Sequence, residues 1–186
     1  MPKPTLPATP AHWETLSEEL HASCRVFDVY KRHCKHPERG SEDDFFVIKS
    51  ADWVQVLALT PEREILLVRQ YRFGTEALSL EVPAGLIDPG ESILEAAARE
   101  LAEETGHAGD TPRLLGSCHP NPAILNNQAH FVLIENCHPK QAQNWDPHEE
   151  IEVLQLPISE AFKQVQSGGI SHAITLSAFF YLKTAL

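Results

Sequence analysis

The residues from Ser92 to Gly106 predict a single helix with two well-defined ends, and this helix constrains the fold of the whole chain. Ser92, followed three residues later by Glu95, fits a capping box, and Gly106 is placed to end the helix in the left-handed conformation. Between these ends the apolar side chains fall on one side, so we expect the helix to pack against a sheet. These side chains belong to Ile93, Leu94, Ala97, Ala98 and Leu101.

Short apolar runs before and after this helix have the composition of strands. We expect strands at 24–33, 65–72, 78–85, 114–116, 130–134 and 152–156, with one long bent strand or two in succession at 44–59. The tight connection at 60–64 predicts a hairpin between the runs on either side of it. Residues 1–12 are expected to form a loose or surface-tethered tail. Helices are expected at 159–167 and 171–184, and weakly at 13–20. This order predicts an α+β fold in which helices pack on the faces of a mixed sheet.

The composition is that of a globular protein and argues against two classes of partner. The chain has 186 residues and a formal net charge of −11, which disfavours nucleic acid and anionic membranes, because both attract basic surfaces. Its four cysteines are scattered without a C-x-x-C pair, as expected for free thiols in a reducing compartment. No apolar run reaches membrane-spanning length and the first residues lack a signal-peptide core, so the expected location is the cytoplasm.

The predicted helix carries a concentration of like charge. Glu100, Glu103 and Glu104 lie close together, and like charges three or four residues apart on a helix repel by about 0.2–0.5 kcal/mol per pair. One interpretation is a solvated charged face. The preceding loop, 85–91, favours another, because its glycines, proline and extra carboxylate bring oxygen ligands to the start of the helix. Such ligands suit a hard cation, Mg²⁺ or Mn²⁺, whose binding would relieve the repulsion.

These residues resemble the signature of a known family. The Nudix box has the pattern G-x5-E-x7-R-E-U-x-E-E-x-G-U, in which U is aliphatic. This chain matches every fixed position, with Gly85, Glu91, Arg99, Glu100, Leu101, Glu103, Glu104 and Gly106. The final aliphatic position departs from the pattern, because it is His107.

Flanking segments extend the resemblance towards one branch of the family. Residues 81–85, EVPAG, resemble the E-x-P-A-G motif of ADP-ribose pyrophosphatases and related nucleoside diphosphate sugar hydrolases. Residues 68–72 are similar to their Q-[YF]-R strand, and residues 171–176 resemble their final helix. The proline-containing loop at 118–130 departs from their Y-P-x-P-G form. The resemblance implies a Nudix fold, an α/β/α sandwich, with a hydrolase domain at 46–186 and an N-terminal tail and strand arm at 1–45.

The resemblance also implies which residues bind the metal. The main ligands would be Glu100, Glu104 and the backbone carbonyl of Ala84, with Glu103 as a second or shared ligand. Glu91 would support the metal site. For Glu91 and Glu103 the alternative is an ordinary surface charge.

The catalytic base implied by the resemblance lies on the loop before the last strand. Alignment of that strand places the base at Glu149, with Glu150 as the neighbouring alternative. An ordinary acidic turn is the other interpretation of this segment. Arg99 is expected to pair with one of the carboxylates of the box.

Substrate contacts are expected from several side chains outside the box. Arg72 is a candidate for binding phosphate, because a guanidinium matches two phosphate oxygens at once; the alternative is a surface arginine. Stacking on a base is a candidate role for two aromatic residues, and hydrogen bonding to sugar or phosphate for three amides. The aromatic residues are Phe46 and Trp53, although aromatic residues in such strands more often belong to the core. The amides are Asn121, Asn126 and Asn127, which could equally stabilise a loop.

The expected function is metal-dependent hydrolysis of nucleoside diphosphate sugars. Narrower alternatives are a strict ADP-ribose pyrophosphatase and a dinucleoside polyphosphate hydrolase, and a different class is a non-catalytic nucleotide-sugar sensor. The apolar residues between 24 and 50 need a surface to cover, either on their own domain or on a second subunit. The resemblance favours a homodimer in which the N-terminal strands reach the partner's substrate site.

Overall fold

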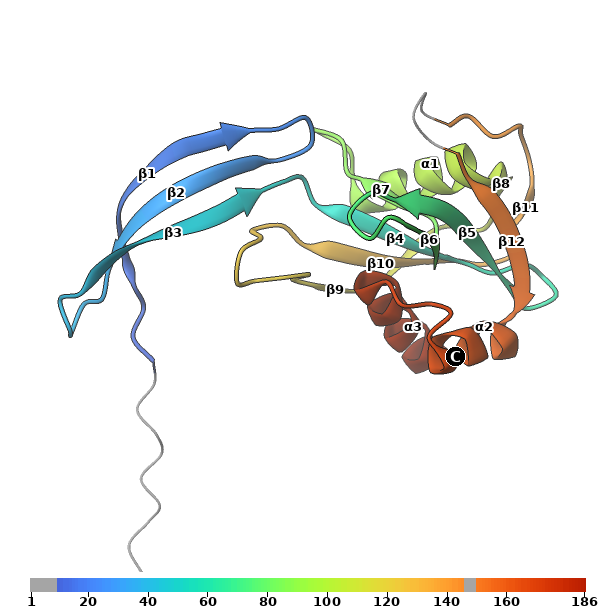
Figure 1. Cartoon of the computed structure of the whole chain (residues 1–186). Helices are drawn as coiled ribbons and strands as arrows, with labels where there is room; N and C mark the ends of the chain where they lie inside the picture. Colours follow the sequence, from blue (N-terminus) through green and yellow to red (C-terminus); the bar gives the residue numbers. More distant parts are fainter. Residues whose placement is uncertain (1–9, 146–149) are drawn as a thin grey trace, which may run out of the picture. The chain divides into compact units, whose positions relative to one another are not determined.

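The computed structural model describes residues 10–145 and 150–186, which form two compact units (Figure 1). The first unit contains the described residues up to Ser50 together with Asn121–Asn126. The second contains the described residues of 51–120 and 127–186. Strand β3 of the first unit runs across position 45, where the sequence suggested a domain boundary.

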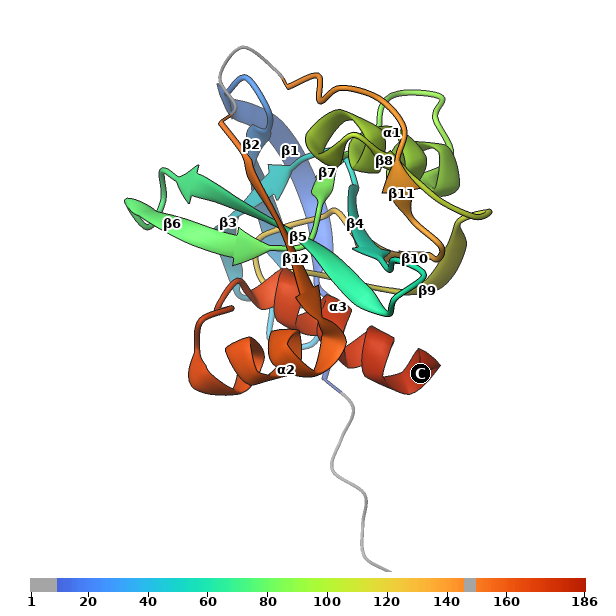
Figure 2. The ribbon, with the colours of Figure 1, turned by 90° about the vertical axis from the view of Figure 1, so that its right-hand side faces the viewer.

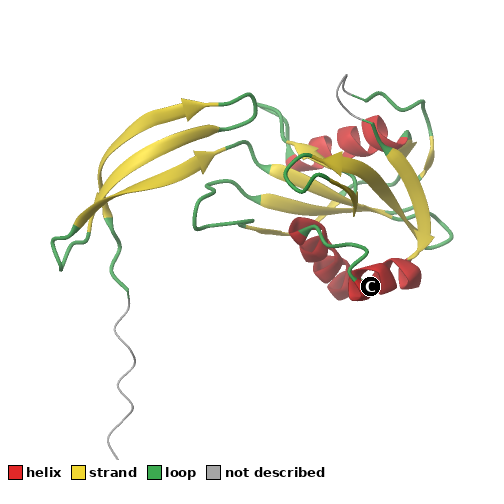
Figure 3. Cartoon of the chain, in the orientation of Figure 1, coloured by secondary structure: helices red, strands yellow, loops and turns green. Residues whose placement is uncertain are grey.

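The first unit is built on an antiparallel sheet with the strand order β1-β2-β3 (Figure 3). Its strands are β1 (Glu14–Ser23), β2 (Asp28–Lys35) and β3 (Glu42–Lys49). The loop 121–126 joins this unit through Ile48, whose backbone N–H donates to the carbonyl of Ile124 at 2.7 Å.

The weak helix expected at 13–20 is wrong, because this segment belongs to strand β1. Pairing with β2 satisfies the backbone of β1 and sets Glu18 opposite Arg32 and Glu19 opposite Lys31. A short helix without an apolar stripe has no comparable source of stability. Strand β2 also begins later than expected, at Asp28, because 24–27 form the turn between β1 and β2.

The second unit contains a four-stranded mixed sheet in the order β7-β4-β10-β9. Strands β4 and β10 are parallel, and the other two pairings are antiparallel. The strands are β4 (Trp53–Ala58), β7 (Ala84–Leu86), β9 (Arg113–Cys118) and β10 (Ala129–Ile134).

A three-stranded antiparallel sheet in the order β12-β5-β6 lies beside it in the same unit (Figure 2). Its strands are β5 (Glu64–Arg72), β6 (Ala77–Glu81) and β12 (Glu152–Pro157), and a small ladder joins β8 (His107–Ala108) to β11 (His138–Pro139). The run at 44–59 forms two strands, β3 and β4. The hairpin expected between β4 and β5 is wrong, because only Leu59 and Ile65 pair before the two strands diverge into different sheets.

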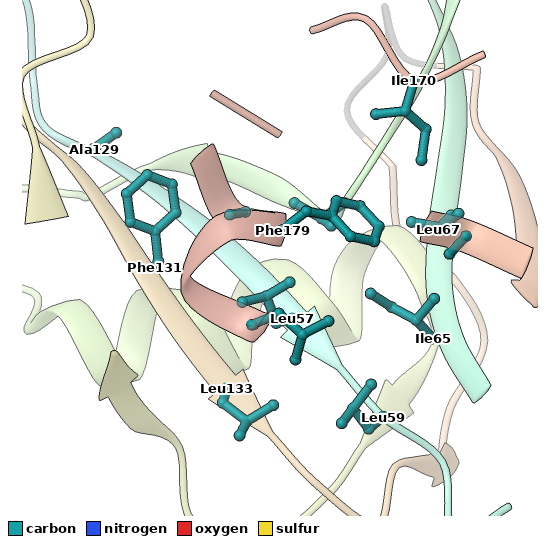
Figure 4. Close-up of a cluster of buried hydrophobic side chains, with 13 residues drawn as sticks. Leu57, Leu59, Ile65, Leu67, Ala129, Phe131, Leu133, Ile170 and Phe179 are labelled. Carbon is teal, nitrogen blue, oxygen red and sulfur yellow. The ribbon is translucent and has the colours of Figure 1, made fainter. Parts of the chain in front are cut away.

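Helices cover the sheets of the second unit on opposite sides, which gives the expected α/β/α sandwich (Figures 1 and 2). They are α1 (Ile93–Thr105), α2 (Ile158–Ser167) and α3 (Ala173–Ala185). The side chains of β4 alternate between the two sides, because successive residues of a strand point to opposite faces. Val54 and Val56 pack with Leu101 of α1, whereas Leu57 packs with Phe179 of α3 in the cluster of Figure 4.

Helix α1 has the expected ends but a rotated buried face. The capping box between Ser92 and Glu95 is present, and Gly106 is left-handed with φ 73°. Leu94 and Ala98 were expected to face the sheet but are exposed. The buried stripe consists of Ala96, Ala97, Leu101, Glu104 and Thr105. This rotation turns part of the acidic face inward, which the apolar pattern alone did not indicate.

Candidate active site

Arg99 is the centre of the acidic cluster on α1. Its Nε and Nη2 donate to the two carboxylate oxygens of Glu91, each at 2.9 Å. Its Nη1 donates to Glu100 at 2.7 Å and to Glu103 at 3.1 Å, and Nη2 also donates to the carbonyl of Leu86 at 2.9 Å. All five N–H donors of the guanidinium are therefore used within the site.

These hydrogen bonds shift the pKa values of Arg99 and of Glu91. Its hydrogen bond to Glu91, followed by those to Glu100 and Glu103, raises the pKa of the guanidinium. The Arg99 hydrogen bonds in turn hold the pKa of Glu91 below its ordinary value, helped by the backbone N–H of Asp88. At neutral pH Glu91 is consequently ionised, and both of its carboxylate oxygens are held by the Arg99 guanidinium.

Glu104 lies one turn further along α1 and is almost fully buried. Its Oε2 accepts a hydrogen bond from the backbone N–H of Ala84 at 3.1 Å. The expected ligands Glu104 and Ala84 are therefore in direct contact, although the contact uses the N–H of Ala84 and not its carbonyl. This hydrogen bond ties the last turn of α1 to strand β7.

Gly85 allows Glu100 to approach strand β7 closely. A Cβ atom at position 85 would overlap all three terminal atoms of the Glu100 side chain. Only a glycine leaves this space, so the first residue of the G-x5-E pattern has a steric reason. Glu100 and Glu104 thus contact the backbone of Gly85 and Ala84 from successive turns of the same helix.

The donor set suits a hard divalent cation, although the described residues do not hold a preformed metal cage. In residues 10–145 and 150–186, no three histidine, cysteine, aspartate or glutamate side chains are grouped as metal ligands. The oxygens of Glu91, Glu100 and Glu103 instead converge on Arg99. The space that Gly85 leaves for a carboxylate, and the hard oxygen donors beside it, fit Mg²⁺ or Mn²⁺ chemistry.

A segment after β11 lies along the C-terminal end of α1. The backbone N–H of Asn144 donates to the carbonyl of Glu103 at 3.0 Å, and the indole N–H of Trp145 donates to the carbonyl of Glu104 at 3.1 Å. These carbonyls are left without partners inside the helix, because a helix cannot satisfy its own last turn. The segment thereby anchors the two acidic residues through their backbones.

Arg72 forms a bidentate ion pair with Glu81. Its Nε and Nη2 donate to the two carboxylate oxygens of Glu81 at 2.8 and 2.7 Å. Glu81 is completely buried, and the imidazole Nδ1 of His172 lies 3.6 Å from its Oε2. Sequence reasoning identified Arg72 but not Glu81 or His172. The first position of the E-x-P-A-G motif was the available signal for Glu81.

The other predicted substrate contacts are engaged locally. Trp53 packs against the buried cluster of the second unit, and the side-chain amide of Asn127 donates to the carbonyl of Ala51 at 3.0 Å. In the first unit, the ring of Phe46 meets His21 edge to face. The side-chain oxygen of Asn126 accepts from the backbone N–H of Ser50 at 3.2 Å.

Two further predicted residues lie in loops, and one lies outside the described part of the chain. Asn121 accepts backbone hydrogen bonds from Ile124 and Leu125 within its own loop. Glu150 is exposed just before β12. Glu149 is not among the described residues, so the choice between Glu149 and Glu150 as base stays a prediction.

Known proteins are similar to this chain in fold and in sequence. A crystal structure of an ADP compounds hydrolase matches with a TM-score of 0.84, covering 97% of each chain at 23% identity. An ADP-ribose pyrophosphatase of Bacillus subtilis (strain 168) is 30% identical over 171 residues, which is 91% of this chain and 92% of that protein. A GDP-mannose pyrophosphatase of Salmonella paratyphi B is 32% identical over 132 residues, 67% of this chain and 69% of that protein.

The Arg99 cluster, together with the similarity to these pyrophosphatases, indicates a hydrolase of the class that generally uses divalent metal ions. The NUDIX domain model matches residues 49–176 of the chain. The protein therefore belongs to the Nudix family and is a pyrophosphohydrolase. Within the described residues, no helix is long and apolar enough to cross a membrane.

Proposed function

We propose that this protein hydrolyses the pyrophosphate bond of nucleoside diphosphate sugars, such as ADP-ribose, ADP-glucose or GDP-mannose, to a nucleoside monophosphate and a sugar phosphate. The observation that carries this proposal is the cluster of Glu91, Glu100 and Glu103 around Arg99, set against Gly85. The relatives named for ADP-ribose and for GDP-mannose support this substrate class.

The proposed cofactor is Mg²⁺, with Mn²⁺ as the alternative. When bound, the ion would neutralise pyrophosphate charge and lower the pKa of a bound water. Glu100, Glu104 and the carbonyl of Ala84 are the proposed ligands, and Glu103 is a second or shared ligand. Glu91 supports this set through Arg99, because both of its carboxylate oxygens are held by that guanidinium.

The remaining roles follow from the reaction itself. Water adds to one phosphorus, the bridging P–O bond breaks, and the bridging oxygen leaves with the other phosphate. Glu149 or Glu150 takes the proton of the attacking water, and Arg72 binds phosphate oxygens. Comparing Glu149→Gln with Glu150→Gln distinguishes the two, because loss of the base lowers kcat far more than it raises KM. No effect of either substitution would assign the base to another group.

One experiment separates this proposal from its alternatives. Release of nucleoside monophosphate is measured for a panel of nucleotide sugars, ADP-ribose and dinucleoside polyphosphates, with and without Mg²⁺. Turnover of several nucleotide sugars supports the proposal. Turnover of ADP-ribose alone, or of dinucleoside polyphosphates alone, would replace it with the narrower activity. Binding without turnover at any Mg²⁺ concentration would identify a sensor.

We further propose that the protein is a cytoplasmic homodimer. All four cysteines are free thiols, which is consistent with a reducing compartment. In the first unit Trp13, Leu20 and Phe45 are exposed, and the pairing register places Leu20 and Phe45 on the same face of the sheet. A second copy of the chain is the proposed cover for this face, with its N-terminal strands contributing base or ribose contacts to the partner's site.

A further inference from the structure

Glu81 is a buried carboxylate outside the Nudix box. It ends strand β6 and has no solvent-exposed surface. Arg72 of β5 binds both of its carboxylate oxygens through the bidentate pair. The Nδ1 of His172, which precedes helix α3, lies 3.6 Å from Oε2 of Glu81, the oxygen that also accepts from Arg72 Nη2, and 3.2 Å from the hydroxyl of Thr175. Three elements of the second unit therefore meet at one carboxylate.

Burying the Glu81 carboxylate costs free energy of folding, and its ion pair with Arg72 is expected to do little more than offset that cost. Removing an ionised carboxylate from water costs several kcal/mol, and a buried ion pair often recovers no more than that cost. Burial acts to raise the pKa of Glu81, but the hydrogen bonds and charge of Arg72 outweigh it and leave the pKa below its ordinary value. Glu81 is therefore ionised, and the main product of the pair is a fixed orientation of the guanidinium.

The position of the pair places that guanidinium near the acidic cluster. Glu81 is three residues before Ala84, so the two Cα atoms lie within about 11 Å of each other. Ala84 in turn contacts Glu104 of α1. The Arg72 side chain is 41% exposed, whereas Glu81 is fully buried, so the pair presents its cationic member to solvent. A diphosphate beside Glu104 would lie within reach of Arg72.

We infer that Glu81 is a positioning residue, which holds the Arg72 guanidinium in the orientation that binds the substrate pyrophosphate, and that His172 of the α3 end restrains Glu81. This inference rests on the proposed function, because it assumes a pyrophosphate substrate. Glu81 itself does not touch the substrate. Its effect passes through Arg72, so helix α3 contributes to phosphate binding without supplying a ligand.

The test is a set of substitutions in the full-length protein, measured with ADP-ribose and Mg²⁺. Glu81→Gln keeps the shape of the side chain but removes the charge that fixes both guanidinium nitrogens. We expect KM to rise about tenfold while kcat changes less than about threefold, because the lost interaction binds substrate and transition state alike. In the Arg72→Ala background, Glu81→Gln should raise KM no further. An independent, multiplicative effect in the double variant would overturn the inference.

A second readout does not require turnover. Calorimetric binding of ADP to the metal-free protein should weaken about tenfold in Glu81→Gln and also in Arg72→Ala. Glu135→Gln is the matched control, because it removes a carboxylate from an exposed arginine pair, Arg63–Glu135 at 3.2 Å, and should leave both readouts unchanged. Unchanged ADP affinity in a folded Glu81→Gln protein would overturn the inference.

Two outcomes separate failure of this inference from failure of the proposed function. If the unsubstituted protein neither binds ADP nor hydrolyses any nucleotide sugar, the proposed function fails. If it does both and only the substitution has no effect, the inference alone fails. Should Glu81→Gln not fold, His172→Asn decides the question, since it removes the imidazole beside Glu81 and leaves the Arg72–Glu81 pair in place. A threefold or larger rise in KM supports the inference, and an unchanged KM contradicts it.

Discussion

At the scale of single residues, the site depends on the positive charge of Arg99 and on the absence of a Cβ atom at Gly85. Arg99 uses every N–H donor to hold three carboxylates and a carbonyl, and Gly85 leaves room for Glu100. These two residues act in opposite ways: one supplies an interaction and the other removes an obstacle.

Gly85→Ala should reduce kcat by about a hundredfold or more, because the added methyl group displaces the Glu100 carboxylate, and overpacking typically costs about 1–3 kcal/mol of stability. Turnover and urea denaturation measure the two effects. Gly74→Ala is the matched control, since nothing lies within 4 Å of a Cβ atom there, and both properties should be unchanged. Normal activity in Gly85→Ala would show that the position of Glu100 is unimportant.

Glu100→Gln and Glu104→Gln should each remove most turnover, with kcat reduced about a hundredfold or more, while the protein stays folded. Each substitution deletes a charge proposed to bind Mg²⁺ and also relieves repulsion along α1. Calorimetric titration with Mg²⁺ and a thermal melt accompany the activity assay. Unaltered activity of either variant at moderate Mg²⁺ would remove that residue from the proposed ligand set.

At the scale of elements, the segment before the predicted base is attached to the acidic helix. Trp145→Phe keeps an aromatic ring but deletes the N–H that donates to the carbonyl of Glu104. We expect a loss of about 1 kcal/mol in the free energy of unfolding, the usual net value of one hydrogen bond, measured by urea denaturation. A free energy equal to that of the unsubstituted protein would mean that water replaces the indole without cost.

The N-terminal sheet should respond to pH through His33. Asp44 at 2.9 Å and Glu42 at 3.3 Å raise the pKa of its imidazole, and the lysines Lys31 and Lys35 pair with the same two carboxylates. Because the folded pKa lies above the unfolded one, the contribution is fully present below the ordinary histidine pKa near 6.5 and is lost as the pH rises through the folded value.

The comparison of His33→Gln with the unsubstituted protein isolates this contribution. Thermal melts of both proteins at a series of pH values from about 5 to 8 should differ most at the acidic end and converge as the pH rises. A difference that grows with pH would contradict the assigned direction of the shift.

At the scale of the whole molecule, the proposed homodimer can be tested through the sheet of the first unit. Phe45→Ser removes an exposed apolar side chain from the face that also contains Leu20. We expect light scattering to report a dimer for the unsubstituted protein and a shift towards monomer for the variant. Glu62→Ser, at an exposed position of the second unit, is the control and should stay dimeric. A monomeric unsubstituted protein would defeat the proposal.

Sequence reasoning predicted most elements of the fold because their signals are local. The ends of α1 are set by Ser92 and Gly106, residues 131–134 form a continuous apolar run, and residues 152–156 are rich in strand-forming aliphatic side chains. Strand β1 was missed because its stability comes from pairing with β2, which its own residues do not display. The supposed hairpin failed for the same reason, since the choice of sheet for β4 and β5 depends on partners far along the chain.

The candidate site was predictable to the extent that it follows the box. The spacing of Arg99 from Glu103 indicated their contact, because residues four apart on a helix are neighbours. The contacts of Arg99 with Leu86 and of Glu104 with Ala84 depend on how the loop returns to the helix. The contacts of Glu81 with Arg72 and His172 join three elements, and neither hydrophobic periodicity nor composition predicts contacts of this kind.

The alternation of side chains along β4 has a consequence for cooperativity. Val56 belongs to the cluster beneath α1, and Leu57, the next residue, belongs to the cluster beneath α2 and α3. Strand β10 divides its side chains in the same way, with Val132 on one side and Phe131 on the other. Because both layers pack on the same strands, separation of β4 from β10 would expose both clusters at once. We therefore expect native-state hydrogen exchange to show the helix with the acidic cluster and the helix after His172 opening with similar free energies.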